Sequence, residues 1–390
     1  MYKRQRLEKE PQECLAALEA HAAFYAQFMA QRWEDLRCER QIRALAEIEA
    51  DIENVRAAWR HYQEQRNVTQ MWLFIKPIWN VYWIRWWNHA GMVLFAEAAN
   101  ALQGEGDDDE ALIALKALVI AFQGYFMAWL DLADQGYQLA KESVAILEQL
   151  DDPEALLLAY DSLLVNAYMV GRYLEEIEAG DKMLKIAAEI NDQWLLAYTY
   201  FAASMSLLVK EDYTKARKLA EMNLQLCEEI GDVVGSTLPL IVLGHVAFAR
   251  EQHQPATAYY LRCLEISEQV GFPYAVQTAS KYLGKAALSI GKIEAAERYL
   301  LQSLAITNEI GFIRDIINLF SEFARLWFAQ GDSEGAVELL ALVLQHPASQ
   351  QTRMHVGRIR DSAKDLLAEL EDELPPETYS AAMERGQDLE

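Results

Sequence analysis

The sequence has few cysteines, prolines and glycines, and too few basic residues to balance its acidic ones. Its four cysteines form no CxxC pair, which argues against both a disulfide framework and a zinc site. Only 9 prolines and 18 glycines occur in 390 residues, too few for a β protein with many turns. Lys and Arg total 35 against 59 Asp and Glu, a net charge of −24, so we expect no direct binding to nucleic acid.

The early part of the sequence contains neither a signal peptide nor a segment suited to span a membrane. Its charged start has no apolar core behind it, so we expect no signal peptide. The most apolar early stretch, residues 71–87, contains Lys76, Pro77 and Arg85 and is too short and too polar to span a bilayer. We therefore expect a cytoplasmic protein that does not enter a membrane.

What the sequence does contain is an internal repeat of 40 residues. One turn recurs with this period and has Asn191, Gly231, Gly271 and Gly311 at its centre. A second turn keeps the same step at Gly171, Glu211, Glu251, Gly291 and Gly331. Between the two turns an alanine recurs, as Ala216, Ala256, Ala296 and Ala336. Two turns per unit, with apolar residues at helical spacing between them, predict that each unit is a helical hairpin.

These hairpins resemble tetratricopeptide repeats. Leu283-Gly284, Gly291 and Ala296 match that family's motif, and Leu243-Gly244 and Ala256 match it one unit earlier. The family's common period is about 34 residues, so the chain resembles the long-helix variety found in kinesin light chains and in bacterial regulators of the maltose-regulon activator class. The resemblance implies an all-α fold, a right-handed superhelical solenoid of helical hairpins with helical caps.

We expect four segments along the chain. Residues 1–66 form an N-terminal cap or linker of two long helices, and residues 67–110 form a degenerate, Trp-rich hairpin. Residues 111–349 hold six repeats, and residues 350–390 form a C-terminal helical cap.

Part of the N-terminal segment resembles a second family. Residues 48–59, preceded by residues 21–25, are similar to a segment of bacterial STAND signalling ATPases, in which it joins a nucleotide-binding module to a C-terminal repeat array. The resemblance implies that the chain is a regulatory part with a parent ATPase module as partner. A simple amphipathic helix packed on the first hairpin explains the segment equally well. No P-loop is present, because Gly284-Lys285 and Gly291-Lys292 lack the upstream glycine and the hydroxyl residue, so we expect no cofactor.

No arrangement of residues suggests catalysis. The seven histidines form no HExxH motif, and no serine lies in GxSxG. We therefore expect no catalytic residue, no metal and no enzymatic activity.

The Trp-rich stretch has two interpretations. Trp72, Trp79, Trp83 and Trp86 are spaced 7, 4 and 3 residues apart, which places them on one helical stripe unless Pro77 breaks the helix. Trp79, Trp83 and Trp86 could form an aromatic platform for a ligand. Packing in the core is the interpretation that we favour, because a single apolar stripe usually faces a core.

A basic ladder emerges when equivalent positions of successive units are compared. In the tetratricopeptide family, the position after the motif glycine faces the concave groove, and here it is occupied by Val165, Met205, His245, Lys285 and Arg325. Lys281 lies one turn before Lys285. His245, Lys281, Lys285 and Arg325 are therefore candidate groove residues for an acidic or phosphate-bearing ligand. The competing interpretation, which we favour, is that they pair with nearby acids such as Glu322.

These observations favour a protein that recognises a partner without catalysis. We expect its concave groove to bind a protein segment or small effector, as the sensor of a STAND-type signalling ATPase or transcriptional regulator. A free-standing adaptor that joins two proteins is the alternative.

Overall fold

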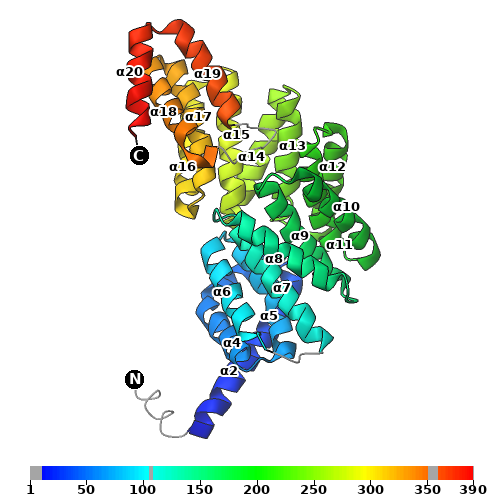
Figure 1. Cartoon of the computed structure of the whole chain (residues 1–390). Helices are drawn as coiled ribbons and strands as arrows, with labels where there is room; N and C mark the ends of the chain where they lie inside the picture. The colour runs from blue at the N-terminus through cyan, green and yellow to red at the C-terminus, as the bar shows by residue number, and fades with distance from the viewer. Residues whose placement is uncertain (1–10, 105–108, 350–358, 390) are drawn as a thin grey trace. The chain divides into compact units, whose positions relative to one another are not determined.

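The computed structural model describes residues 11–104, 109–349 and 359–389, and these residues form helices without any β-strand (Figure 1). The chain divides into two compact units. Unit 1 comprises Met1–Leu163 and Glu228–Val233, and unit 2 comprises Leu164–Cys227 and Val234–Glu390. The all-α fold class expected from the repeat is confirmed.

Unit 1 begins with three helices rather than the two long ones expected, followed by helical hairpins. Asp51 interrupts the second expected helix because its backbone leaves the helical region, with φ −111° and ψ 14°. The N-terminal helices are α2 (Pro11–Asp35), α3 (Gln41–Ala50) and α4 (Ile52–Glu64). The hairpin helices are α5 (Val68–Ile84), α6 (Asn88–Ala101), α7 (Glu110–Met127), α8 (Ala133–Leu147) and the first part of α9 (Pro153–Met169).

Unit 2 continues the same alternation of first and second helices. Its hairpin helices are the end of α9, α10 (Tyr173–Ile190), α11 (Gln193–Val209), α12 (Tyr213–Ile230), α13 (Thr237–Ala249), α14 (His253–Val270), α15 (Pro273–Ser289), α16 (Ile293–Ile310), α17 (Ile313–Gln330) and α18 (Ser333–Gln345). A short 3-10 helix, Pro347–Ser349, follows, and α19 (Ile359–Glu373) and α20 (Pro376–Gln387) complete the unit.

The repeated turn residues occupy the left-handed region of backbone space. The hairpin turns have positive φ angles at Asp131, Gly171, Glu211, Glu251, Gly291 and Gly331. The turns between hairpins have positive φ angles at Asn191, Gly231, Gly271 and Gly311. Glycine and asparagine tolerate this conformation, which ends a helix and turns the chain. The 40-residue period of the sequence therefore reflects helices that end at the same position in successive units.

The two helices of a hairpin cross closely at the recurring small residues. A Cβ atom on Gly244 would lie 2.4 Å from the ring of Tyr260, and one on Gly284 would lie 2.7 Å from Leu300. The alanines at 216, 256, 296 and 336 are fully buried. Small side chains at these positions let the first helix approach the second.

The C-terminal helices pack on the last hairpin. A Cβ atom on Gly386 of α20 would lie 2.2 Å from the carbonyl oxygen of Glu338 on α18, so the two helices are in close contact. Leu366 and Leu370 of α19 join the hydrophobic cluster formed by α17 and α18. This covers the apolar side of the last hairpin, as a terminal repeat requires.

Helix α7 is a core helix. Its 18 residues are long and apolar enough to cross a membrane, and among the described residues it alone meets that test. Within the structure, however, 67% of this window is buried, and α6 and α8 both pack against it.

Candidate binding surfaces on the first helices

The first helices of successive hairpins lie next to one another and carry the candidate site residues. We call this surface the first-helix face. In unit 1 it is formed by α5, α7 and the start of α9, and in unit 2 by the end of α9, α11, α13, α15 and α17. The basic ladder lies in unit 2.

His245 of α13 is buried and uncharged. Its Nδ1 atom lies 2.6 Å from the hydroxyl oxygen of Tyr260, and its ring centroid lies 4.3 Å from that of Tyr282. The pKa of His245 is lowered from 6.5 to about 3. Burial is the largest cause, and the positive charges of Lys281 and Lys285 act in the same direction. At neutral pH this histidine therefore adds no positive charge to the ladder.

Lys281 of α15 forms a buried ion pair with α17. Its Nζ atom donates to Asp315 Oδ1 at 3.1 Å, and the two side chains are 5% and 9% exposed. Gln277 Nε2 donates to the other oxygen, Asp315 Oδ2, at 2.9 Å. Both oxygens of this carboxylate therefore have partners, which offsets the cost of burying the charges.

Lys285 and Arg325 each bind the next helix along the array. Lys285 of α15 pairs with Glu322 of α17, the acid expected from the sequence to compete for it. Arg325 of α17 donates to the carbonyl oxygen of Ser362 at 3.1 Å and to its hydroxyl oxygen at 2.9 Å, on α19. The structure thus brings His245, Lys281 and Lys285 together around Tyr282 and directs Arg325 to the C-terminal cap.

The first-helix face of unit 2 changes from apolar to polar along the array. One column of equivalent positions reads Phe201, Ile241, Lys281 and Ser321. The next column reads Met205, His245, Lys285 and Arg325. In these columns α11 and α13 carry mainly apolar side chains and α15 and α17 carry polar ones. The residues at 241, 245, 281 and 321 are buried, so the change from apolar to polar reaches the surface at the other four positions.

Helices far apart in sequence meet inside unit 2. Arg314 of α17 donates through Nη1 to the sulfur of Met169 on α9, at 2.7 Å, across 145 residues of sequence. Both side chains are buried, with 6% exposure each. Tyr168, next to Met169, is close enough to Tyr274 and Tyr282 of α15 to interact with them electrostatically, and burial raises its pKa. Part of the face is therefore filled by its own side chains, whereas Phe201, Met205, Lys285 and Arg325 stay partly exposed.

Glu176 of α10 is a buried carboxyl that the sequence analysis did not single out. It occupies the column held by alanine in the next four hairpins and is 1% exposed. Burial raises its pKa from 4.5 to about 8, opposed by a hydrogen bond with Ser206 and the charge of Lys210. The sequence did contain a signal for this residue, because Glu176 is an acid at a repeat position where the following four units have alanine.

The three tryptophans proposed as a platform are core residues of unit 1. Pro77 lies within α5 without ending it. Trp79 is fully buried and stacks on Phe122 of α7, with centroids 5.0 Å apart. Trp83 and Trp86 are 6% and 4% exposed, and Trp86 packs against Trp129. Their burial leaves no exposed platform, and the core interpretation of the stripe explains their positions.

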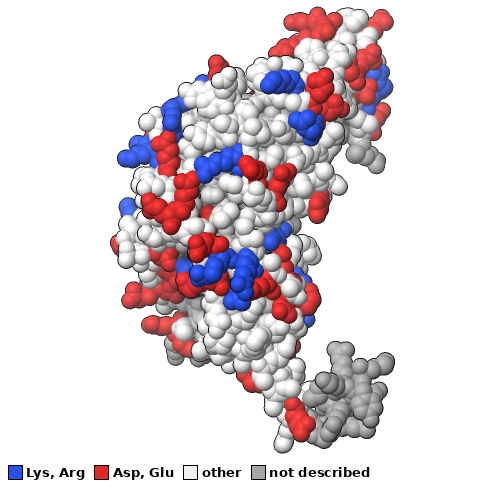
Figure 2. All heavy atoms as spheres, turned by 180° about the vertical axis from the view of Figure 1, so that it is seen from behind, with Lys and Arg blue, Asp and Glu red and all other residues white. Residues whose placement is uncertain are grey.

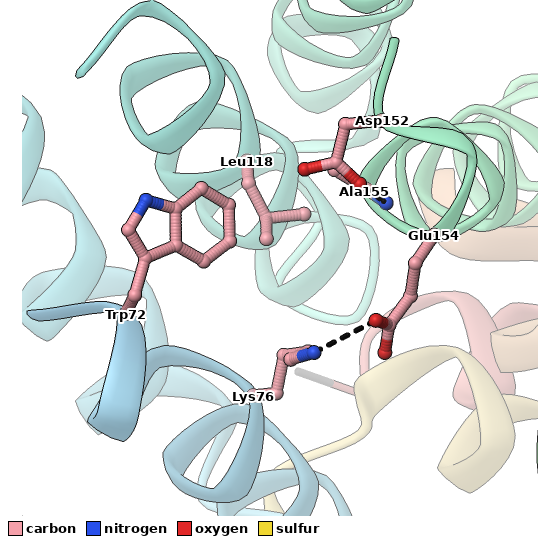
Figure 3. Close-up of a pocket in the computed structure, with 6 residues that line it drawn as sticks. All are labelled: Trp72, Lys76, Leu118, Asp152, Glu154 and Ala155. Atoms are coloured by element: carbon pink, nitrogen blue, oxygen red, sulfur yellow. Dashed lines mark hydrogen bonds and ion pairs between the residues drawn. The ribbon is translucent and has the colours of Figure 1, made fainter. Parts of the chain in front are cut away.

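Trp72, at the start of the same stripe, borders a pocket in unit 1 instead (Figure 3). The pocket has a volume of about 150 Å³ and is lined by Trp72, Lys76, Leu118, Asp152, Glu154 and Ala155. Lys76 Nζ donates to Glu154 Oε2 at 2.8 Å across the pocket. The sequence could not reveal this site, because its walls come from three helices that only the tertiary fold brings together.

Charges of both signs are mixed on the surface. On the face shown in Figure 2, Lys and Arg side chains lie beside Asp and Glu side chains. The described part of the chain contains no group of three His, Cys, Asp or Glu residues placed to hold a metal ion. Burial also raises the pKa of the Cys263 thiol, which opposes formation of a reactive thiolate.

Comparison with known proteins identifies the architecture. No protein-family model matches the sequence, and no curated protein matches it. Among solved structures, a STAND protein with a tetratricopeptide repeat sensor from Pyrococcus horikoshii has a TM-score of 0.52 at 17% identity, covering 88% of this chain and 53% of that one. The fold is a tetratricopeptide-like repeat solenoid.

Two further solenoids support this assignment. A Rap protein complexed with competence and sporulation factor has a TM-score of 0.51 at 12% identity, covering 95% of this chain and all of that one. The apo form of RapI has a TM-score of 0.50 at 13% identity, covering 82% and 85% of the two chains. At these identities the likeness establishes the solenoid fold alone.

Proposed function

We propose that the chain is a non-catalytic scaffold that binds a protein segment or small effector on the first-helix face of unit 2. The observation that carries the proposal is the change of this face from partly exposed apolar side chains on α11 to partly exposed basic side chains on α15 and α17. Phe201 and Met205 stay partly exposed at one end, and Lys285 and Arg325 at the other. Such a face offers apolar contact and charge-assisted hydrogen bonds to one partner.

The ion pairs of this face determine which of its basic side chains can bind an acidic ligand. Lys281 and Lys285 are already matched by Asp315 and Glu322, so an incoming acid gains little unless it displaces one of those carboxylates. Arg325 is held by a neutral serine, and its charge is not cancelled by that contact. We therefore expect Arg325 and the exposed edge of Lys285 to contribute more to binding than Lys281 or His245.

Site-specific photocrosslinking tests the proposal. A benzophenone amino acid replaces Phe201 or Met205 on the first-helix face, and Leu261 or Leu301 on second helices as matched controls. Leu261 and Leu301 are 44% and 50% exposed. We expect a defined adduct, identified by mass spectrometry, from the first-helix positions alone. Equal adducts from both sets of positions would contradict the proposal.

Two similar solved structures support two different roles for this scaffold. The likeness to a STAND protein with a repeat sensor, of whose whole chain 53% is covered, supports a regulatory part of a signalling ATPase. The full-length likeness to a Rap protein bound to a factor supports a free-standing adaptor. We favour the regulatory part, in a cytoplasmic signalling protein. A GxxxxGK[ST] motif in the reading frame upstream of Met1 is the expected result, and a start codon at Met1 without one would favour the adaptor.

A further inference from the structure

The pocket of unit 1 is a second site with its own chemistry, formed by the first helices of unit 1 and not by those of unit 2. Leu118 and Ala155 form an apolar floor and are 0% and 2% exposed. Trp72 forms one wall, and its indole nitrogen donates to the carbonyl oxygen of Ala111 at 3.3 Å, which fixes the ring. Lys76 and the carboxylates of Asp152 and Glu154 form the rest of the rim (Figure 3).

The rim of the pocket is negative. Asp152 and Glu154 contribute two negative charges against the single positive charge of Lys76. The Lys76 ammonium is held in place, because it donates to Glu154 Oε2 and lies 5.8 Å from the centroid of the Trp33 ring. It therefore neutralises one carboxylate and leaves the charge of the other.

Asp152 has one oxygen directed to the pocket. Its Oδ1 atom accepts from the backbone N–H of Ala155 at 3.0 Å and caps helix α9. Figure 3 shows the other oxygen on the side of Leu118 and Trp72. A ligand atom beside this oxygen would meet a carboxylate, which attracts cations, next to the apolar side chains of Leu118 and Trp72.

We propose that this pocket binds a single organic cation, an alkylammonium or alkylguanidinium group with a short aliphatic chain. The cationic head lies against the Asp152 carboxylate, and the aliphatic chain lies on Leu118, Ala155 and the Trp72 ring. The volume of about 150 Å³ suits a group of this size. The same chemistry is available from a free amine and from a Lys or Arg side chain of another protein.

Calorimetric titration of the full chain with n-butylammonium and n-butylguanidinium tests the proposal. A ligand of five to eight heavy atoms reaches a dissociation constant on the order of 1 mM. We expect both cations to bind in this range, and n-butanol and butyrate to bind at least about tenfold more weakly. Equal binding of the cation and n-butanol, or no cation binding up to about 20 mM, would overturn the proposal.

Variants locate the bound cation. Asp152→Asn removes the charge but keeps a good helix cap, and we expect it to weaken cation binding about fivefold without lowering the unfolding temperature. Glu142→Gln, an exposed acid on α8 outside the pocket, is the matched control and should bind normally. Unchanged affinity in Asp152→Asn, or an equal loss in Glu142→Gln, would overturn the assignment.

Short peptides with capped, uncharged ends distinguish the source of the cation. If acetyl-Gly-Lys-Gly-amide or its Arg analogue binds as well as the free amine, the pocket can accept a protein side chain. Binding of the free amine alone restricts the site to small molecules. Either result supports a cation pocket when Asp152→Asn weakens it, and failure of peptides and amines alike refutes it.

Discussion

Two buried side chains, Glu176 and His245, have pKa values shifted toward their neutral forms. Glu176 has a pKa of about 8 and is protonated at neutral pH, and His245 has a pKa of about 3 and is unprotonated. Both shifts have burial as their largest cause. Their effects on stability have opposite pH dependence, because one group must lose a proton to become charged and the other must gain one.

Glu176→Gln should change how stability depends on pH. In the wild-type chain the folded state retains a proton that the unfolded state loses as pH rises from 4.5 to about 8, so this group's contribution to the free energy of unfolding falls across that window. The fall is on the order of 4 kcal/mol. Urea unfolding at pH 5, 7 and 8.5 should show that the free energy of unfolding of the variant rises relative to that of the wild type as pH increases. A constant difference between the two proteins would refute the assigned shift.

His245→Gln should act in the acidic range. The unfolded state binds a proton on this histidine as pH falls below 6.5, whereas the folded state does so only near pH 3. The wild-type free energy of unfolding therefore decreases across that window as the solution is acidified. Glutamine preserves a polar partner for Tyr260 but does not titrate. We expect the variant to lose less stability between pH 7 and 5, measured by urea unfolding, and parallel curves would contradict the prediction.

At the scale of the element, hairpin turns that share one backbone conformation differ in their residues. Gly291 and Glu251 both have positive φ angles, 70° and 57°, at equivalent positions. A non-glycine residue in this region costs on the order of 1 kcal/mol. Turns with glutamate therefore store backbone strain that turns with glycine lack.

Exchange of these residues should change stability in opposite directions. Glu251→Gly should raise the free energy of unfolding by about 0.5 kcal/mol, less than the strain relieved, because glycine also loosens the unfolded chain. Gly291→Ala should lower it by about 1 kcal/mol, and it introduces no clash because no atom lies within 4 Å of the new Cβ. Thermal unfolding measures both effects. Destabilisation by both substitutions would show that glutamate at 251 makes contacts outweighing the strain.

The 40-residue repeat predicted the helix boundaries better than it predicted the residues of the candidate binding sites. Glycines and alanines at fixed steps were enough to place the helix ends and close crossings, because those depend on local backbone geometry. The break at Asp51 was missed because aspartate is common on exposed helix surfaces as well as at helix ends. The remaining features depend on tertiary contacts that the sequence does not show. Lys281 pairs with Asp315, 34 residues away, and the Trp72 pocket is formed by three helices.

At the scale of the whole molecule, helices pack against one another both within each hairpin and between neighbouring hairpins. The C-terminal cap illustrates this, since Arg325 of α17 holds α19 through Ser362. In a repeat array each element depends mainly on the next one, so loss of a cap contact should be felt locally.

Arg325→Ala should loosen the C-terminal helices and leave unit 1 unchanged. We expect hydrogen exchange to speed up in residues 359–373 by about fivefold, the equivalent of 1 kcal/mol of local opening. Arg298→Ala, which removes an exposed arginine of α16, is the control and should not alter exchange in this segment. Equal exchange in the wild type and in Arg325→Ala would show that apolar packing alone holds α19.

The left-handed turns also bear on how such a chain can change its length. At four successive junctions the hairpin ends in the same backbone state, 40 residues after the previous one, at Asn191, Gly231, Gly271 and Gly311. Recombination between two equivalent turns would join a helix end to a helix start in the native geometry. It would remove or duplicate a whole hairpin without creating a strained junction. An array with such junctions can therefore lose or gain one whole repeat at a time.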